Sequence, residues 1–170
     1  KNPDLAADDR QRVARMVGIG AVKYADLSTD RVRDYVFEWE RMLSFDGNTA
    51  PYLQYAHARI CSIFRRAGID RSSIAATQLR LVETQERDLA LRILGFDAAI
   101  IDTLERYSPH RLCTYLYELS TAFTAFYEHC PVLKADDESV RASRLALCDL
   151  TARVLHRGLD LLGIEAPEQM

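Results

Sequence analysis

The feature that most constrains the fold is a stripe of apolar residues between Pro109 and Pro131. Its members follow one another at alternating steps of four and three, and they are Leu112, Leu116, Leu119, Phe123, Phe126 and Cys130. Such steps place side chains on one face of an α-helix, in the heptad-like pattern of a helix that packs along its length against another. Proline is tolerated in the first turn of a helix but not in its interior. The stripe therefore predicts a long packed helix over residues 109–130.

Four other stretches also show apolar residues at helical spacing. They are residues 8–27, 50–67, 84–104 with a break at Gly95, and 137–162. No stretch alternates polar and apolar residues as a strand would, and Gly and Pro number only 7 and 5 in the 170 residues. We therefore predict a single all-α fold, a bundle of about five or six helices. The helices near 50–67, 109–130 and 137–162 should form its centre.

Local signals set some helix boundaries and leave others open. Thr49 or Asn48 is predicted to cap the helix at 50–67, and Gly68 to end it. Gly18 and Gly20 are read as a helix break or a point of close packing. Residues 28–48 look irregular, with Ser28 or Thr29 as the cap of a short charged segment at 30–35. Residues 69–83 are a connection without a clear period.

Charge and cysteine use narrow the possible functions. The net charge of −3 argues against binding nucleic acid through bulk positive charge. The four cysteines are widely spaced and are expected to be buried, reduced residues, so no metal site is predicted. We also find no catalytic arrangement around the histidines and predict no catalytic residue. No apolar run is long enough for a membrane span, so no membrane partner is expected.

Tyrosine and arginine share one face of the helix at 50–67. Tyr52, Tyr55 and Arg59 are spaced by three and four residues. A flat ring beside a guanidinium is the combination that holds unstacked RNA bases. The alternative is that these tyrosines, like Tyr115, Tyr117 and Tyr127, are half-buried core residues and that Arg59 is a surface ion-pair partner.

Several long motifs resemble arginyl-tRNA synthetases in the same order along the chain. They are VGIGAVKYADL (17–27), FDGNTAPYLQYAHAR (45–59), YLYEL (115–119), FYEHCPVL (126–133), SRLAL (143–147) and LLGIEAPEQM (161–170). The resemblance implies the all-α anticodon-binding domain called DALR over residues 28–170. Residues 1–27 would be the connecting helix that follows a catalytic domain.

The resemblance also implies a function for the longer enzyme. That enzyme is cytoplasmic and joins L-arginine to its tRNA, using ATP and Mg, in protein synthesis. Its ATP-binding signatures, of HIGH and KMSKS type, do not occur in this chain. We therefore expect a fragment that starts just after the catalytic core, is inactive alone and binds tRNA weakly. Its partners would be the anticodon loop of tRNA(Arg) and the catalytic domain of the same enzyme, and not DNA.

Site residues are carried over by motif. The residues implied to meet anticodon nucleotides are Tyr52, Tyr127 and Met170. A supporting role falls to Tyr55, Arg59, Phe45 and Asn48. The loop at 44–49 corresponds to one that moves when tRNA binds, and we expect it to couple anticodon binding to the segment at 17–27. Two alternatives stay open: a stand-alone helical interaction module without a role in translation, and a synthetase of another amino acid with the same fold.

Overall fold

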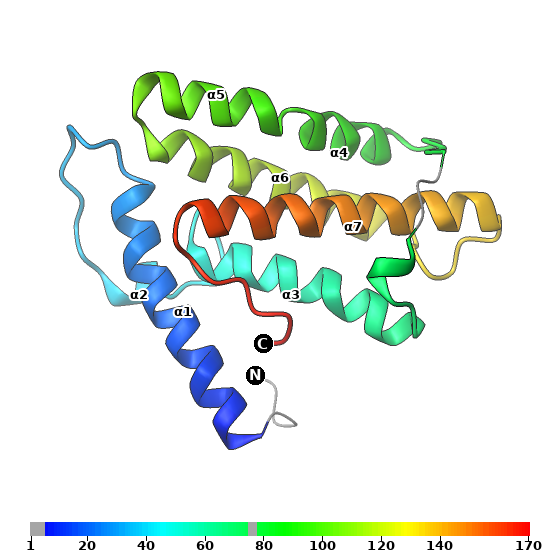
Figure 1. Ribbon diagram of the computed structural model, residues 1–170, viewed down its shortest axis with the longest axis horizontal. Coiled ribbons are helices and arrows are strands. Elements are labelled where there is room, and N and C mark those ends of the chain that lie inside the picture. The colour runs from blue at the N-terminus through cyan, green and yellow to red at the C-terminus, as the bar shows by residue number, and fades with distance from the viewer. Residues whose placement is uncertain (1–5, 75–77) are drawn as a thin grey trace.

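Two antiparallel helices, α6 (Pro109–His129) and α7 (Glu138–Leu161), lie at the centre of the fold (Figure 1). The computed structural model describes residues 6–74 and 78–170. All members of the predicted apolar stripe are buried, which confirms the long packed helix. A Cβ atom on Gly158 of α7 would lie 2.4 Å from Leu116 Cδ2 of α6. Glycine therefore lets the two central helices approach closely.

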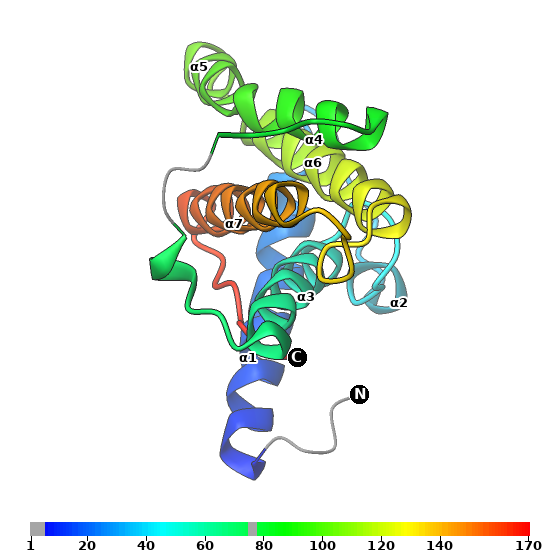
Figure 2. The same ribbon diagram turned by 90° about the vertical axis from the view of Figure 1, so that its right-hand side faces the viewer.

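The other helices cover this pair on two sides. α4 (Thr84–Leu94) and α5 (Phe96–Arg106) lie on one side, and α3 (Ala50–Ala67) lies on the other, with α1 (Ala7–Leu27) packed against α3 (Figure 2). A one-turn helix, α2 (Trp39–Met42), precedes α3, and a short 3₁₀ turn, η1 (Arg71–Ser73), follows it. The described residues contain no strand. The prediction of an all-α bundle is confirmed.

The predicted boundaries of α3 are confirmed. Thr49 caps the helix, because its hydroxyl oxygen accepts a hydrogen bond from Tyr52 N at 3.3 Å. Pro51 occupies the first turn, where its missing N–H has no helical partner to lose. Gly68 ends the helix at φ = +64°, a left-handed conformation that suits glycine. These signals fix where α3 presents its tyrosines.

Two other expectations need correction. α1 runs unbroken through Gly18 and Gly20, so the break is wrong, whereas close packing is right for Gly20: a Cβ there would lie 3.0 Å from Gln54 Nε2. Ser28 does not cap a following helix. It ends α1, because its N–H donates to Tyr24 O at 2.8 Å, and residues 30–35 form no helix.

The predicted connection at 69–83 holds η1, which Asp70 caps through Ser72 N. Residues 75–77 of it lie outside the described part. All four cysteines are buried and unbridged. Among the described helices, none has a stretch long and apolar enough to cross a lipid bilayer.

Candidate nucleic-acid interface

The C-terminal segment is held along α3 by three hydrogen bonds to its backbone. Gln54 Nε2 donates to Glu165 O at 2.8 Å, and Arg65 Nη1 donates to Glu168 O at 2.9 Å. Between them, His57 Nδ1 lies 3.0 Å from Pro167 O. Burial lowers the pKa of His57, which favours the neutral ring in this contact. The segment that ends in Met170 therefore has a defined path across the helix.

This path brings Met170 to a hollow on the surface of α3. The hollow has a volume of about 310 Å³, and we call it the tyrosine–arginine hollow. Its lining residues are Tyr55, Ala58, Arg59, Ser62, Arg65, Arg66, Tyr127 and Met170. Four residues singled out from the sequence, on α3, on α6 and at the C-terminus, thus meet at one place.

The guanidinium of Arg59 lies beside two tyrosine rings of this hollow. Its guanidinium carbon lies 4.7 Å from the ring centroid of Tyr127 and 5.8 Å from that of Tyr55. Phe45 packs edge-on against Tyr55 at a centroid distance of 6.0 Å, and Phe123 stacks on Tyr127 at the same distance. The two rings that flank Arg59 are therefore held in place by aromatic neighbours.

Tyr52 lies outside the tyrosine–arginine hollow. Its half-buried ring lies 5.7 Å from that of Tyr117, and its Oη lies 3.4 Å from Thr124 Oγ1 on α6. The structure therefore divides the predicted aromatic set. Tyr55 and Tyr127 belong to the hollow, and Tyr52 belongs to the contact between α3 and α6.

Asn48 lies on the loop before α3 and faces α1. Its Oδ1 accepts a hydrogen bond from Tyr24 Oη at 2.6 Å, and the same hydroxyl lies 2.9 Å from Cys113 O. Burial of Tyr24 raises the pKa of its phenol, so the hydroxyl stays neutral and can donate. Gln54 Nε2, which holds the C-terminal segment, also donates to Met16 O of α1 at 3.2 Å. The loop and α3 are thus both hydrogen-bonded to α1.

The hollow concentrates positive charge in an acidic chain. Arg59, Arg65 and Arg66 form no ion pair with any described residue. By contrast, Arg71 pairs with Asp149 at 3.0 Å, and the buried Arg144 pairs with Glu86 at 2.6 Å. The alternative of Arg59 as a surface ion-pair partner is therefore wrong. An anion near this hollow would meet three guanidinium groups that are not engaged in ion pairs with described residues.

Sequence reasoning missed two kinds of residue. Arg65 and Arg66 line the hollow. The spacing of seven from Arg59 could have placed Arg66 on the same helix face, whereas the spacing of six gives no such signal for Arg65. Gln54 and His57 hold the C-terminal segment, more than 100 residues away in the chain. No pattern within α3 signals that contact.

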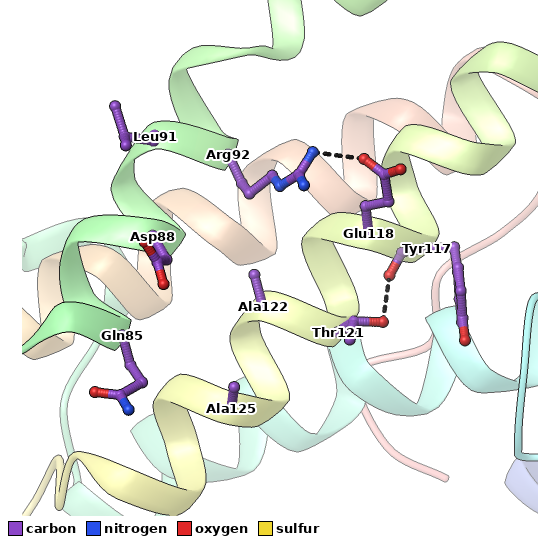
Figure 3. Close-up of a pocket in the computed structure, with 9 residues that line it drawn as sticks. All are labelled: Gln85, Asp88, Leu91, Arg92, Tyr117, Glu118, Thr121, Ala122 and Ala125. Carbon is purple, nitrogen blue, oxygen red and sulfur yellow. Dashed lines mark hydrogen bonds and ion pairs between the residues drawn. The ribbon is translucent and has the colours of Figure 1, made fainter.

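A wider groove between α4 and α6 contains none of the predicted site residues. It has a volume of about 700 Å³, with Ala122 and Ala125 on the α6 side (Figure 3). Its arginine, Arg92, is paired with Glu118 at 2.5 Å, and Asp88 adds a second carboxylate. The two carboxylates of this groove do not favour RNA, whereas the unpaired arginines of the tyrosine–arginine hollow do.

Comparison with known families agrees with the helical architecture. A family model described as the DALR anticodon binding domain matches residues 53–170. A second model, described as the catalytic domain of class I tRNA synthetases (R), matches residues 1–39. The first match contains every residue of the tyrosine–arginine hollow.

Individual relatives show the same likeness along the whole chain. An arginine–tRNA ligase from Shigella dysenteriae is 52% identical over all 170 residues. The arginyl-tRNA synthetase structure of Thermus thermophilus matches 99% of this chain with a TM-score of 0.90 and 40% identity, and that of Plasmodium falciparum matches 95% with a TM-score of 0.86 and 37% identity. The chain spans 30%, 29% and 28% of these proteins, respectively.

These likenesses support the resemblance to the arginine enzymes and give no support to a stand-alone interaction module or to a synthetase of another amino acid. The match of the family model over residues 53–170 and the identity of 52% over the whole chain lead to one assignment. The chain belongs to the DALR anticodon-binding domain family, in the form found in arginyl-tRNA synthetases.

Proposed function

We propose that this chain binds the anticodon loop of tRNA(Arg) through the tyrosine–arginine hollow and supplies this recognition to an arginine–tRNA ligase. One observation carries the proposal: the Arg59 guanidinium lies over two tyrosine rings beside the C-terminal Met170, with no carboxylate paired to it among the described residues. Aromatic and guanidinium planes bind unstacked bases, and the free charge attracts the phosphates. Recognition then depends on a local surface and not on the net charge.

The predicted residues take different parts in this proposal. Tyr127, Arg59 and Met170 meet a splayed base in the hollow, and Tyr55, against which Phe45 packs edge-on, forms its aromatic wall. Tyr52 offers a second aromatic edge beside Tyr117 for a neighbouring nucleotide.

We propose that residues 1–27 connect this domain, residues 28–170, to a catalytic domain. Asn48 and Gln54 support the connection, because one joins the loop and the other joins α3 to α1. A change in the loop or in α3 on tRNA binding would thus reach α1 directly. The resemblance to arginyl-tRNA synthetases implies that arginine activation requires bound tRNA. In a ligase that contains this chain, replacing Asn48 by Ala should weaken that dependence while leaving tRNA affinity largely intact.

We assign ATP and Mg to the catalytic domain of the longer cytoplasmic enzyme. Among the described residues, no group of three or more His, Cys, Asp or Glu is placed to hold a metal ion. The proposed role of the described residues is to bind and orient tRNA. Arginine-dependent ATP–pyrophosphate exchange by the isolated chain would contradict this division of roles.

The test of anticodon binding is a titration of the chain with tRNA(Arg). Tyr127→Ala should raise Kd by about 5- to 150-fold, the effect of losing a stacking contact of roughly 1–3 kcal/mol. The matched control is Tyr107→Ala, because Tyr107 is a 77% exposed tyrosine at the end of α5 and lines none of the hollows described. Equal affinities for the wild type and the Tyr127 variant would refute the proposal.

A further inference from the structure

Arg144 of α7 is a buried cation at the end of the bundle where α6 ends and α4 begins (Figure 1). Its Nε donates a hydrogen bond to Glu86 Oε1 of α4 at 2.6 Å, and its Nη1 donates to Pro131 O at 2.9 Å. Pro131 is the second residue after α6. One side chain of α7 therefore joins the start of α4 to the end of α6.

The two charges of this pair lie where the helix ends favour them. Glu86 is in the first turn of α4, and its Oε2 accepts hydrogen bonds from Glu83 N at 2.9 Å and from Val82 N. A helix start favours a carboxylate, and a helix end, such as that of α6, favours a cation. Burial by itself raises the pKa of Glu86, but the hydrogen bonds from Glu83 N and Arg144 outweigh it and hold the pKa below its usual value. The pair is therefore ionised.

A buried ion pair is weak evidence for a role in stability. The cost of taking both charges out of water roughly cancels their attraction, and apolar residues of similar size often replace such a pair without loss. An apolar residue cannot replace the hydrogen bond to Pro131 O. Because proline has no N–H, the carbonyl is the polar backbone group through which residue 131 can be held. Arg144 thus fixes the backbone between the buried side chains of Cys130 and Val132.

The backbone fixed in this way adjoins the last turn of α6, which carries Tyr127. Tyr127 lies four residues before Pro131, and its ring centroid lies 4.7 Å from the guanidinium carbon of Arg59 on α3. The last carbonyls of a helix lack helical partners, so a helix end frays unless other groups hold it. Without the bond from Arg144, the last turn of α6 would be less fixed relative to α3.

We propose that Arg144 is a positioning residue for RNA binding, which holds the end of α6 so that the Tyr127 ring stays beside Arg59. The inference rests on the proposed function, in which Tyr127 meets a splayed base. It adds a buried residue of α7 that does not line the tyrosine–arginine hollow. Affinity for RNA would then depend on a contact that the RNA does not touch.

The test removes the bond to Pro131 O without leaving a buried charge unpaired. In the pair variant, Glu86→Gln with Arg144→Met, the glutamine oxygen can still accept the hydrogen bonds from Val82 N and Glu83 N. Glu86→Gln alone keeps Arg144 and its bond to Pro131 O, but it leaves a buried cation without its carboxylate. The single variant should therefore unfold at a lower urea concentration than the pair variant.

Titration with tRNA(Arg) should give the opposite order. The pair variant should raise Kd by at least about 5-fold, the smallest effect of a lost stacked base, and by no more than Tyr127→Ala does. Glu86→Gln should keep the Kd of the wild type, whereas a merely structural role would make Kd follow stability. The matched control is Glu118→Gln with Arg92→Met, which removes an exposed pair of the same residue types between α4 and α6. It should leave Kd unchanged.

A double-mutant cycle tests whether Arg144 acts through Tyr127. In a chain that already carries Tyr127→Ala, the pair variant should raise Kd no further. If the pair variant does not fold, Arg144→Lys takes its place in the cycle, because lysine keeps a charge beside Glu86 but lacks the planar fork that reaches two acceptors.

The outcomes separate this inference from the proposed function. A wild-type Kd in the pair variant, a larger Kd in Glu86→Gln than in the pair variant, or the same fold-change with and without the Tyr127 ring would overturn the positioning role. An unchanged Kd in Tyr127→Ala would instead overturn the proposed function.

Discussion

Replacing Arg59 by methionine should separate binding from folding in the tyrosine–arginine hollow. Methionine keeps an unbranched side chain beside Tyr55 and Tyr127 but removes the guanidinium plane and its charge. In the proposed function that plane meets the RNA base, so the variant should bind tRNA(Arg) poorly while the fold is kept.

The magnitudes differ enough to be measured. Loss of one stacked base contact of roughly 1–3 kcal/mol raises Kd by about 5- to 150-fold. The two cation–π contacts of Arg59 are worth about 0.5–1 kcal/mol each at exposed sites, and sulfur–aromatic contacts of the new methionine offset part of that loss. Since 1 kcal/mol shifts Tm by about 2–4 °C in a chain of this size, Tm should fall by only a few degrees.

Fluorescence anisotropy of labelled tRNA(Arg) and thermal unfolding by circular dichroism provide the two readouts. Arg59→Lys is the informative companion, because it keeps the charge and loses the plane. We expect its affinity to lie between those of the wild type and Arg59→Met. Wild-type affinity of Arg59→Met would refute the role of Arg59, and wild-type affinity of Arg59→Lys would refute stacking as its basis.

Three further predictions concern the framework of the site. Gly158→Ala should destabilise the fold by about 1–3 kcal/mol, measured by urea unfolding, because its Cβ would lie 2.4 Å from Leu116 Cδ2. The helix-cap hydrogen bonds from Ser139 hold the pKa of Asp137 at about 2, below the roughly 3.9 of the unfolded chain. This stabilisation is complete above about pH 4 and is lost as the pH falls towards 2. The urea midpoint of unfolding should therefore fall less steeply with decreasing pH in Asp137→Ala than in the wild type. Gln54→Leu should release the C-terminal segment, seen as faster amide hydrogen exchange at residues 165–170 and weaker tRNA binding.

Each of these predictions has a contrary outcome. Wild-type stability of the Gly158 variant would mean that the central helices separate at little cost. An acid limb unchanged in Asp137→Ala would assign the acid sensitivity to other carboxylates. Slow exchange retained in the Gln54 variant would show that His57 and Arg65 suffice to hold the segment.

Much of the secondary structure could be predicted because its signals are local. The threonine cap, Pro51 and Gly68 act within a few residues of the helix ends they set, and the apolar stripe of α6 follows from 3.6 residues per turn. The error at Ser28 has the same origin. A serine can follow one helix or precede another, and only the backbone partner of its N–H, Tyr24 O, decides which.

The resemblance carried Tyr52, Tyr127 and Met170 over as equal members of one site, and it could not show how they group. Their grouping depends on contacts between α3, α6 and the C-terminal segment, which are far apart in the chain. Spacing places Tyr52 and Tyr55 on one face of α3, yet a difference of three residues, close to one turn, leads one to Tyr117 and the other to the hollow.

The amino-acid sequence by itself determined the helices, most of their ends and the family. Capping residues, the spacing of apolar residues and the order of motifs can all be read along the chain without knowledge of which residues meet in space. The tertiary structure decided which arginines lack a carboxylate partner, where Met170 lies and which rings flank Arg59. Those properties depend on through-space neighbours. A chain of net charge −3 can present a positive, aromatic surface because folding gathers Arg59, Arg65 and Arg66 in one hollow, while arginines such as Arg71 and Arg144 pair with carboxylates elsewhere.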